Sequence, residues 1–394
     1  MPLMDLLFSD EEVQFREQVR TWLAENAPTE GRPDAPEAIR EYDLWWQRRQ
    51  WDGGWAGIAW PVEYGGRGLS LVQQLIWYEE YARAGLPAID ACFVGLNHAG
   101  PTLMACGTAE QQAAHLPKIL RGDVIWCQGF SEPSAGSDLA ALRTKAVIDG
   151  DDLVVTGQKI WTSFASIADH QELLVRTTSG ERKHHGITWV ICDMNTPGIE
   201  IRPIETIDRG AEFCEVFYDD VRIPLKNVVG EVDNGWPVAL STLSFERGTA
   251  FTGSQMRLSK TVESLVELAR EHVGPDGRRP AIADDHIATA LATLRTEVAA
   301  LRAMTYASIS RNARSDTPGP EGSISKLYYS EIAKRAAHLA MEILGQDGLA
   351  FVSRWHRPFG WTGHYVYSYS VSISGGTSEV QRNIIGERVL GLPR

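Results

Sequence analysis

Residues 128–140 read QGFSEPSAGSDLA, a run of small hydroxyl residues and glycines at the point where two kinds of sequence meet. Before it, apolar residues recur at helical spacing, and after it short strand-like runs alternate with turn residues. Such a loop can present backbone amides and hydroxyls to a polar ligand, although by composition an ordinary turn is the simpler interpretation. Its position divides the chain and therefore decides the fold class.

The first 120 residues or so carry helical signals. Ser9 and Glu12 form a capping box ahead of a periodic segment at residues 13–23. A second helix is predicted at residues 71–85, LVQQLIWYEEYARAG, which its last glycine closes. Between them, the Gly- and Trp-rich residues 51–70 form a loop. Its GGRG is no dinucleotide-binding fingerprint, because no βαβ unit surrounds it.

The middle region, residues 121–236, has the character of strands. AVIDGDDLVVTGQKIWTS, residues 146–163, predicts a hairpin around Asp149 and Gly150 or the residues beside them. Three further strand-like runs follow, separated by turn residues: ELLVRTT, ITWVICDM and EFCEVFYDDVRIP. These patterns predict a small antiparallel β domain with a barrel-like form.

Helical patterns return after Trp236. One core stripe comprises Ile287, Leu291, Leu294, Val298 and Leu301, and a second comprises Tyr328, Ile332, Ala336, Leu339 and Ile343. The chain is therefore expected to be an α+β protein of three domains. These are an N-terminal α-helical domain at 1–120, a central antiparallel β domain at 121–236 and a C-terminal helical bundle at 237–394.

Composition limits the classes of partner. The chain has 394 residues, 43% of them hydrophobic, and its net charge of −13 argues against nucleic acid or an anionic membrane as the main partner. Its five cysteines include no CxxC pair, which favours a reducing compartment over a disulfide framework or a zinc site. The N-terminus has no signal or transit pattern, so a cytoplasmic location is expected.

Taken as a whole string, QGFSEPSAGSDLA resembles the corresponding loop of the flavin-dependent acyl-CoA dehydrogenases. Other stretches resemble the same family in the same order: WPVEYGG, GTAEQQAAHLPKIL, TGQKIWTS, GITWVICDMNTPGIEIRPI and EVFYDDVRIP. The resemblance covers most of the chain and implies the acyl-CoA dehydrogenase fold, with helices, then strands, then helices.

The resemblance also implies a reaction and a cofactor. Members of the family remove two hydrogens across the α and β carbons of an acyl-CoA: a carboxylate takes the α proton, and N5 of the flavin in FAD accepts the β hydride. By resemblance, Ser137 lies near the acyl-CoA. The residues implied to contact the flavin are Gln128, Phe130, Ser131, Trp161 and Ser163. From the sequence pattern alone, Trp161 is simply an aromatic residue in a strand, and Ser163 is a hydroxyl residue in a turn.

The stretch SISGGTSEV, residues 372–380, departs from the family. In most members, the position matched by Gly375 holds the catalytic glutamate, in a Glu-Gly-Thr motif. Either the chain is catalytically inactive or the base has moved. A minority of members carry the base on an earlier helix, and Glu246 in STLSFERGTAFTGS matches that position.

Periodicity supports Glu246 independently. Ala239, Leu243, Glu246, Ala250 and Gly253 fall on one face of a helix, and that face is small and apolar. The competing interpretation is a solvated glutamate beside its arginine neighbour, the usual fate of a helical Glu-Arg pair. We predict that Glu246 is the catalytic base.

Gly375 retains a second role by resemblance. Its backbone N–H and a ribityl hydroxyl of the flavin would bind the thioester oxygen as negative charge builds there. Thr377 and Glu379 match positions that contact the adenine-diphosphate part of FAD. Arg247 matches an arginine near the active site, where it would support substrate binding.

Two motifs that normally reach a neighbouring subunit's flavin are altered. AREHVGPDGRRPAIADDH lacks the usual Phe-Gly, and EILGQDGL, residues 342–349, replaces a glycine-rich Gln motif. The chain therefore resembles one half of an α2β2 tetramer, such as the actinobacterial dehydrogenases of steroid side-chain CoA thioesters. The expected electron acceptor is an electron-transfer flavoprotein. The alternatives are a non-catalytic companion subunit and a flavin oxygenase on the same fold.

Overall fold

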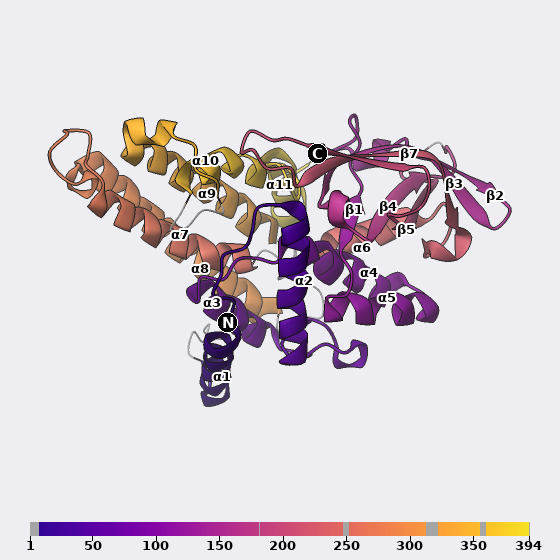
Figure 1. The fold of residues 1–394 in the computed structure, drawn as a ribbon, viewed down its shortest axis with the longest axis horizontal. Helices are drawn as coiled ribbons and strands as arrows, with labels where there is room; N and C mark the ends of the chain where they lie inside the picture. The colour runs from indigo at the N-terminus through magenta and orange to yellow at the C-terminus, as the bar shows by residue number, and fades with distance from the viewer. Residues whose placement is uncertain (1–7, 181, 247–251, 313–321, 355–359, 394) are drawn as a thin grey trace. The chain divides into compact units, whose positions relative to one another are not determined.

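The computed structural model describes residues 8–180, 182–246, 252–312, 322–354 and 360–393. The chain divides into two compact units, and we treat each by itself. The helical unit comprises residues 1–31, 69–87 and 247–394, and the mixed unit comprises residues 32–68 and 88–246. Figure 1 labels most of their helices and strands.

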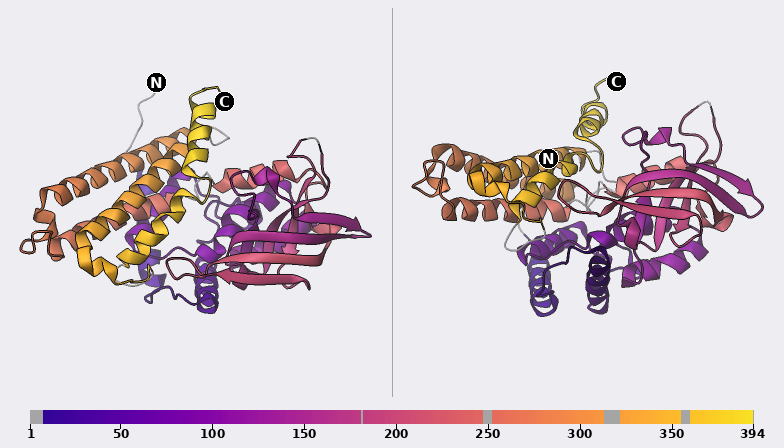
Figure 2. Two further views of the ribbon diagram at one scale, coloured as in Figure 1. Left: turned by 90° about the horizontal axis from the view of Figure 1, so that it is seen from above. Right: turned by 45° about the horizontal axis from the view of Figure 1, so that its top comes forward.

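The helical unit is built from α-helices. They are α1 (Asp10–Asn26), α3 (Leu71–Arg83), α7 (Thr252–Glu271), α8 (Asp285–Asn312), α9 (Gly322–Leu344), α10 (Trp361–Ser368) and α11 (Ser378–Ile384), followed by a π-helical turn (Ile385–Val389). Figure 2 shows the long helices α7, α8 and α9 side by side. The capping box of Ser9 and Glu12 begins α1 as predicted.

The core of the helical unit lies between α7, α8 and α9. The predicted stripe on α8 is buried at all five positions, from Ile287 to Leu301. The stripe on α9 is buried at Ile332, Ala336, Leu339 and Ile343, whereas Tyr328 is half-buried at the edge of the cluster. Both stripes are confirmed, because residues three and four apart share a helix face.

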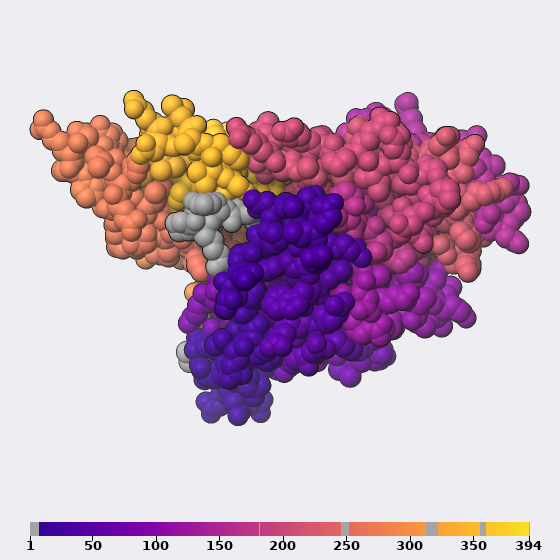
Figure 3. Space-filling view, in the orientation of Figure 1, coloured from indigo at the N-terminus to yellow at the C-terminus, as the bar shows by residue number. Residues whose placement is uncertain are grey.

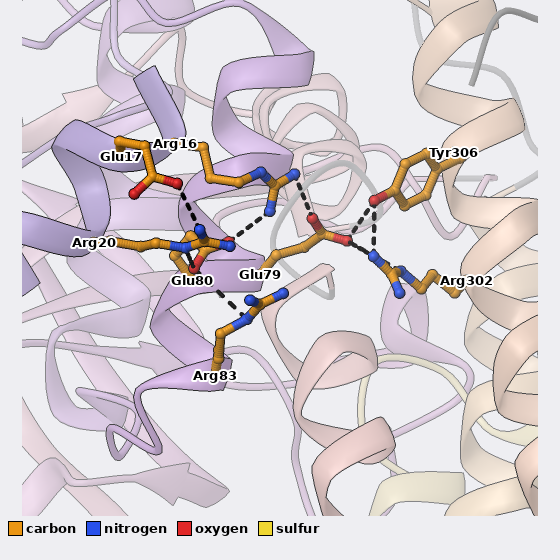
Figure 4. Close-up of polar contacts among 8 residues, drawn as sticks. All are labelled: Arg16, Glu17, Arg20, Glu79, Glu80, Arg83, Arg302 and Tyr306. Carbon is orange, nitrogen blue, oxygen red and sulfur yellow. Dashed lines mark hydrogen bonds and ion pairs between the residues drawn. The ribbon is translucent and has the colours of Figure 1, made fainter. Parts of the chain in front are cut away.

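Buried carboxylates on α3 join three helices of this unit (Figure 4). Glu79 accepts hydrogen bonds from Arg16 of α1 at 2.9 Å and from Arg302 of α8 at 2.6 Å. The Tyr306 hydroxyl, also on α8, donates to the same carboxylate at 2.5 Å. Charge-assisted bonds of this kind are stronger than neutral ones. Glu79 therefore fixes how α1 and α8 pack on α3.

Glu80, the next residue, binds α1 and also lies 3.7 Å from Arg83 of its own helix. Arg16 and Arg20 donate to its carboxylate at 2.5 and 2.7 Å, and its side chain is 1% exposed. Burial alone would raise the pKa of Glu80, but the two guanidinium groups outweigh burial and hold it below its usual value. The carboxylate is therefore charged at neutral pH and binds α1 to α3.

Replacing Glu80 with glutamine should destabilise this unit. Glu80→Gln removes the buried anion that Arg16 and Arg20 share, leaving them only Glu79 and Glu17, and breaking a buried ion pair costs about 3 kcal/mol or more. Glu17 makes an exposed pair with Arg20, so Glu17→Gln is the matched control and should cost less than about 0.5 kcal/mol. Urea unfolding of both variants measures the difference. Equal, small losses would show that the Glu80 cluster is dispensable.

The mixed unit combines helices with a sheet. Its helices are α2 (Pro36–Asp52), α4 (Gly100–Cys106), α5 (Ala109–Arg121) and α6 (Gly235–Glu246). Its strands are β1 (Trp126–Gly129), β2 (Lys145–Asp149), β3 (Asp152–Ser163), β4 (His170–Arg176), β5 (Ile187–Asp193), β6 (Ile199–Ile204), β7 (Phe213–Pro224) and β8 (Val228–Val229). In Figure 3 the violet surface of α5 adjoins the strands, and ring contact between His115 and His170 joins α5 to β4.

The strands form one sheet in the order β6-β7-β3-β2-β4-β5-β8, and β1 pairs with β4. Most pairs are antiparallel, but β1 and β2 each meet β4 in parallel. Closure into a barrel would require the two end strands to pair. Among the described strands, β6 and β8 do not pair, so the sheet is open. The predicted order of helices, strands and helices is confirmed.

Local signals located most strands. The β2–β3 hairpin turns at Gly150 and Asp151, within the predicted stretch around Asp149 and Gly150, and Gly150 has a φ of +62°. The three strand-like runs become β4, β5 and β7. The sequence did not indicate β1 or β6 as strands. The four residues of β1, WCQG, show no alternation, and the alternation in β6, IEIRPI, is short and interrupted by Pro203. Among the described residues, no helix has both the length and the apolar character to cross a bilayer.

Candidate active site

A buried ion pair fastens the 128–140 loop to β3. The Lys159 ammonium, on β3, lies 2.9 Å from the carboxylate of Glu132 and donates to the carbonyl of Phe130 at 3.1 Å. Glu132 also accepts the backbone N–H groups of Arg143 and Thr144 at 2.7 and 2.8 Å. One carboxylate therefore anchors both ends of the loop to a single strand.

The pair is almost completely removed from solvent, with Lys159 0% and Glu132 6% exposed. Burial lowers the pKa of Lys159 to about 8, although the charge of Glu132 opposes this. Burial would raise the pKa of Glu132, but Lys159 and the hydrogen bonds at Thr144 outweigh it and lower that pKa. At neutral pH both groups are charged, and the ion pair is intact.

The loop brings its predicted flavin residues beside β3. The N–H of Ile160 donates to the Ser131 carbonyl at 3.0 Å, so Ser131 is adjacent to the strand that carries Trp161 and Ser163. Ser131 and Ser163 are half-buried, whereas Phe130 packs into the core. Ser137, the predicted acyl-CoA residue, is exposed farther along the loop. These side chains thus lie on two neighbouring segments of one unit.

Trp161 has an unusual backbone. Its φ is +60°, a left-handed value that bulky side chains rarely adopt, and the register of β3 against β7 shifts between Lys159 and Thr162. The side chain is 56% exposed, and its one described ring neighbour is Phe213, edge-on at 6.1 Å. Strain of this kind costs about 1–3 kcal/mol and concentrates at ligand sites. The strand therefore presents a large aromatic face outward.

Gln128 joins a buried polar cluster. Its side-chain amide donates to the Glu172 carboxylate at 2.7 Å and lies 3.2 Å from Nδ1 of His98. Register pairs Gln128 of β1 with Glu172 of β4. His98 belongs to a π-helical turn, Gly95–Ala99, and such turns are frequent at functional sites. A carboxylate can only accept, so the amide carbonyl of Gln128 is the atom left for a ligand.

The predicted base is only partly described. Glu246 is the last residue of α6, and its side chain lies outside the described residues, as do Arg247 and Ala250. Upstream on the predicted apolar face, Ala239 is buried and Leu243 packs against the core. Gly253 is buried near the start of α7. The described positions of the predicted face are thus inward, but they lie on two separate helices, α6 and α7, and residues 247–251 between them are outside the described residues.

The second group of predicted residues forms one turn in the helical unit. Gly375 and Gly376 have φ values of +63° and +91°. The Thr377 hydroxyl accepts the N–H of Val380 at 3.3 Å and caps α11. Glu379 is exposed and lies 3.4 Å from Arg382.

Comparison with known proteins identifies the family. Three domain profiles match in order: "Acyl-CoA dehydrogenase, N-terminal domain" at residues 9–123, "middle domain" at 127–221 and "C-terminal domain" at 233–390. The chain belongs to the acyl-CoA dehydrogenase family. It is therefore an FAD-dependent enzyme that dehydrogenates acyl-CoA thioesters.

Relatives of this acyl-CoA dehydrogenase include several mycobacterial proteins. Acyl-CoA dehydrogenase IpdE1 of Mycobacterium tuberculosis is 40% identical, over 97% of this chain and 98% of the relative. One chain of the ChsE4-ChsE5 complex from the same organism is 34% identical with a TM-score of 0.85, over 99% of this chain and 100% of that chain. A chain of the Tcur3481-Tcur3483 steroid ACAD is 30% identical, with the same TM-score and coverage.

The residues of the mixed unit fit the flavin of an acyl-CoA dehydrogenase. A planar ring system with polar edges suits an outward aromatic face flanked by hydroxyls, and Trp161, Ser131 and Ser163 supply these. The sequence did not identify Glu132, Lys159 or Glu172. Glu132 lies inside the quoted loop, and a lysine within the otherwise strand-like residues 152–163 was the available signal.

Replacing Lys159 should weaken the anchoring of the 128–140 loop and with it the retention of FAD. Lys159→Met leaves Glu132 buried without a cation, which should cost about 3 kcal/mol and lower FAD retention. Lys183 makes an exposed pair with Asp138 of the same loop, so Lys183→Met should cost less than about 1 kcal/mol and retain FAD. Thermal unfolding and bound flavin absorbance measure both effects. Full FAD retention in Lys159→Met would contradict the anchoring role.

Proposed function

We propose that this enzyme oxidises bulky acyl-CoA thioesters, with steroid side-chain thioesters as the preferred class, and uses Glu246 as its base. Gly375 carries the proposal. By resemblance, it occupies the position of the usual catalytic glutamate, and it has no side chain and a φ of +63°. A glutamate there would be strained as well as bulky. The names of the steroid ACAD relatives support the same substrate class.

The packing of α6 in the core supports the assignment of Glu246 as the catalytic base. Thr242, one turn before it, is fully buried, and its hydroxyl lies 2.9 Å from that of Thr102 on α4. Ala239, a turn earlier, is also fully buried. The helix that ends in Glu246 is thus fixed to the core. A base must be held in place to remove a proton from a weak carbon acid.

The proposed reaction follows from these groups. The Glu246 carboxylate takes the α proton, and the backbone N–H of Gly375 donates to the thioester oxygen as it gains charge. Bound FAD supplies the redox chemistry by accepting the β hydrogen with its electron pair. Two C–H bonds break, one C=C bond forms, and the product is an enoyl-CoA.

The remaining site residues have binding roles in this proposal. Ser137 and Arg247 would contact the acyl-CoA. The residues that would hold FAD are Gln128, Phe130, Ser131, Trp161, Ser163, Thr377 and Glu379.

Substitution of the base tests the proposal. Glu246→Gln keeps the shape but cannot accept a proton, so turnover should fall by about 10³ while bound FAD is unchanged. Glu267, exposed on α7 beside Arg270, provides the control Glu267→Gln, which should be fully active. Steady-state rates with a steroid side-chain thioester and an artificial electron acceptor measure both. Unchanged turnover in Glu246→Gln would assign this chain to a non-catalytic companion subunit.

We also propose a second, homologous subunit as partner in an α2β2 tetramer. The two altered motifs support it, and the ChsE4-ChsE5 relative is a complex of two named chains. One altered stretch forms a tight loop in which Val273 pairs with Pro280. The other begins at Glu342, which lines a groove of about 470 Å³ between α8, α9 and α10. His286 and His338 flank that carboxylate at 3.2 and 3.4 Å.

The proposed partner subunit can be tested by measuring the bound FAD per chain and the native mass of this chain expressed alone. The expected result is little bound FAD, restored to half occupancy when a homologous subunit is co-expressed. One FAD per chain in a homotetramer would contradict the mixed tetramer, and the altered motifs would then serve another role.

An electron-transfer flavoprotein is the proposed electron acceptor, and the cytoplasm the proposed location, which the free thiols of all five cysteines support. A flavin oxygenase is the competing assignment. Steady consumption of oxygen with an added reductant would favour the oxygenase.

A further inference from the structure

The turn at Gly375 and Gly376 needs support from outside itself. Both residues have left-handed φ values, +63° and +91°. Glycine adopts such values without strain, but it also has the most backbone freedom of any residue. A catalytic hydrogen-bond donor must instead be held still, because reorientation during the reaction adds to the barrier. The neighbouring side chains therefore have to fix this turn.

Two buried side chains hold the carbonyl oxygens of the turn. The Lys326 ammonium, on α9, donates to the Gly376 carbonyl at 2.7 Å. The side-chain amide of Gln381, on α11, donates to the Gly375 carbonyl at 2.8 Å and to that of Gly376 at 3.3 Å. Lys326 is 4% exposed and Gln381 1% exposed. Burying an ammonium is costly, so its presence here calls for a role.

Further contacts make the arrangement specific. A Cβ on Gly376 would lie 2.7 Å from the amide nitrogen of Gln381, so the glycine leaves the space that this amide occupies. The Ser378 hydroxyl donates to Glu331 of α9 at 3.0 Å. Lys326 and Glu331 thus tie the turn to α9 at two points.

Holding the carbonyls orients the amides. In a trans peptide, the C=O and the following N–H point in opposite directions. Pinning the Gly375 and Gly376 carbonyls fixes the two peptide planes that flank Gly376 and limits rotation about Gly375. Within the described part of the chain, neither the Gly375 nor the Gly376 N–H meets an acceptor. The Gly376 N–H shares its peptide plane with the pinned Gly375 carbonyl and is therefore an oriented donor. The Gly375 N–H, one peptide earlier, is oriented through the restricted rotation about Gly375.

We propose that Lys326 and Gln381 are positioning residues for the dehydrogenation. They fix the glycine turn so that the Gly375 N–H stays directed at the thioester oxygen while charge builds on it. The donated hydrogen bonds also polarise the peptide groups of the turn, which strengthens their amides as donors. This inference rests on the proposed function, in which Gly375 supplies that N–H.

Two isosteric substitutions in the FAD-loaded enzyme test it. Lys326→Met removes the ammonium, and Gln381→Glu directs a group that only accepts at two carbonyls. Each should lower kcat by about 10–100-fold with KM changed less than about 3-fold, because the lost contact acts mainly in the transition state. Lys326→Arg keeps a donor and should recover part of kcat.

The control is an exposed cation elsewhere on α9. Because Lys334 pairs with Glu331, which contacts the turn, the control substitution is made one residue on, at Arg335. Arg335 pairs with Glu297 of α8 and is 48% exposed, so Arg335→Met should keep wild-type kcat. Melting temperature and bound FAD are measured for every variant. If kcat falls only where bound FAD or melting temperature also falls, and recovers with saturating FAD or at a lower assay temperature, then these residues have a merely structural role. That result would overturn the proposal.

Acetoacetyl-CoA gives a second readout that does not depend on turnover. Hydrogen bonds to its thioester oxygen lower the pKa for forming its enolate, which absorbs ultraviolet light. Binding to Glu246→Gln enzyme that also carries Lys326→Met or Gln381→Glu should show a smaller enolate fraction than Glu246→Gln alone. An equal fraction would overturn the positioning role. Failure of the wild-type enzyme to oxidise any acyl-CoA would instead refute the proposed function, and the enolate measurement would still judge the turn.

Discussion

The proposed flavin-binding residues of the mixed unit depend on one buried ion pair, between Lys159 of β3 and Glu132 of the 128–140 loop. Replacing such a pair with apolar residues is often neutral for stability, whereas losing one partner is costly. Its value here is therefore geometric. Glu132 also binds the amides of Arg143 and Thr144, so the loop cannot shift along β3 without breaking charge-assisted bonds. Trp161 and Ser131 keep their spacing as a result.

The glycine turn of the helical unit is held in a similar way. There too a buried lysine, Lys326, binds a backbone carbonyl. In both units the charged group is away from solvent and donates a hydrogen bond to a backbone carbonyl of an irregular segment. The enzyme thus places polar backbone groups by hydrogen bonds to side chains on a helix or strand.

Local features of the sequence predicted much of the fold. The Ser9 capping box, the Asp149–Gly150 hairpin and the stripes on α8 and α9 each depend on residues within a few positions, and all formed. The short strand β1 escaped prediction because its strand character comes from pairing with β4. The left-handed backbone of Trp161 gave no signal, since no glycine marks it.

The candidate site was harder to predict because its key contacts span the sequence. Glu132 and Lys159 are 27 residues apart, Gln128 and Glu172 are 44 apart, and Lys326 and Gly376 are 50 apart. Periodicity and capping rules relate residues only a few positions apart in the sequence, so they cannot predict these contacts. The missing glutamate at Gly375 was visible in the sequence only because the neighbouring residues resembled a known family. The hydrogen bonds that hold that turn could be identified only from the structure.

The exposure of Trp161 has a consequence for the life of the chain in the cell. The Trp161 side chain is 56% exposed on a strand with a left-handed backbone, and in the proposed site bound flavin would cover it. Ligands that bind only the folded chain protect it from unfolding and degradation. In that case the supply of flavin would affect how much of this protein accumulates.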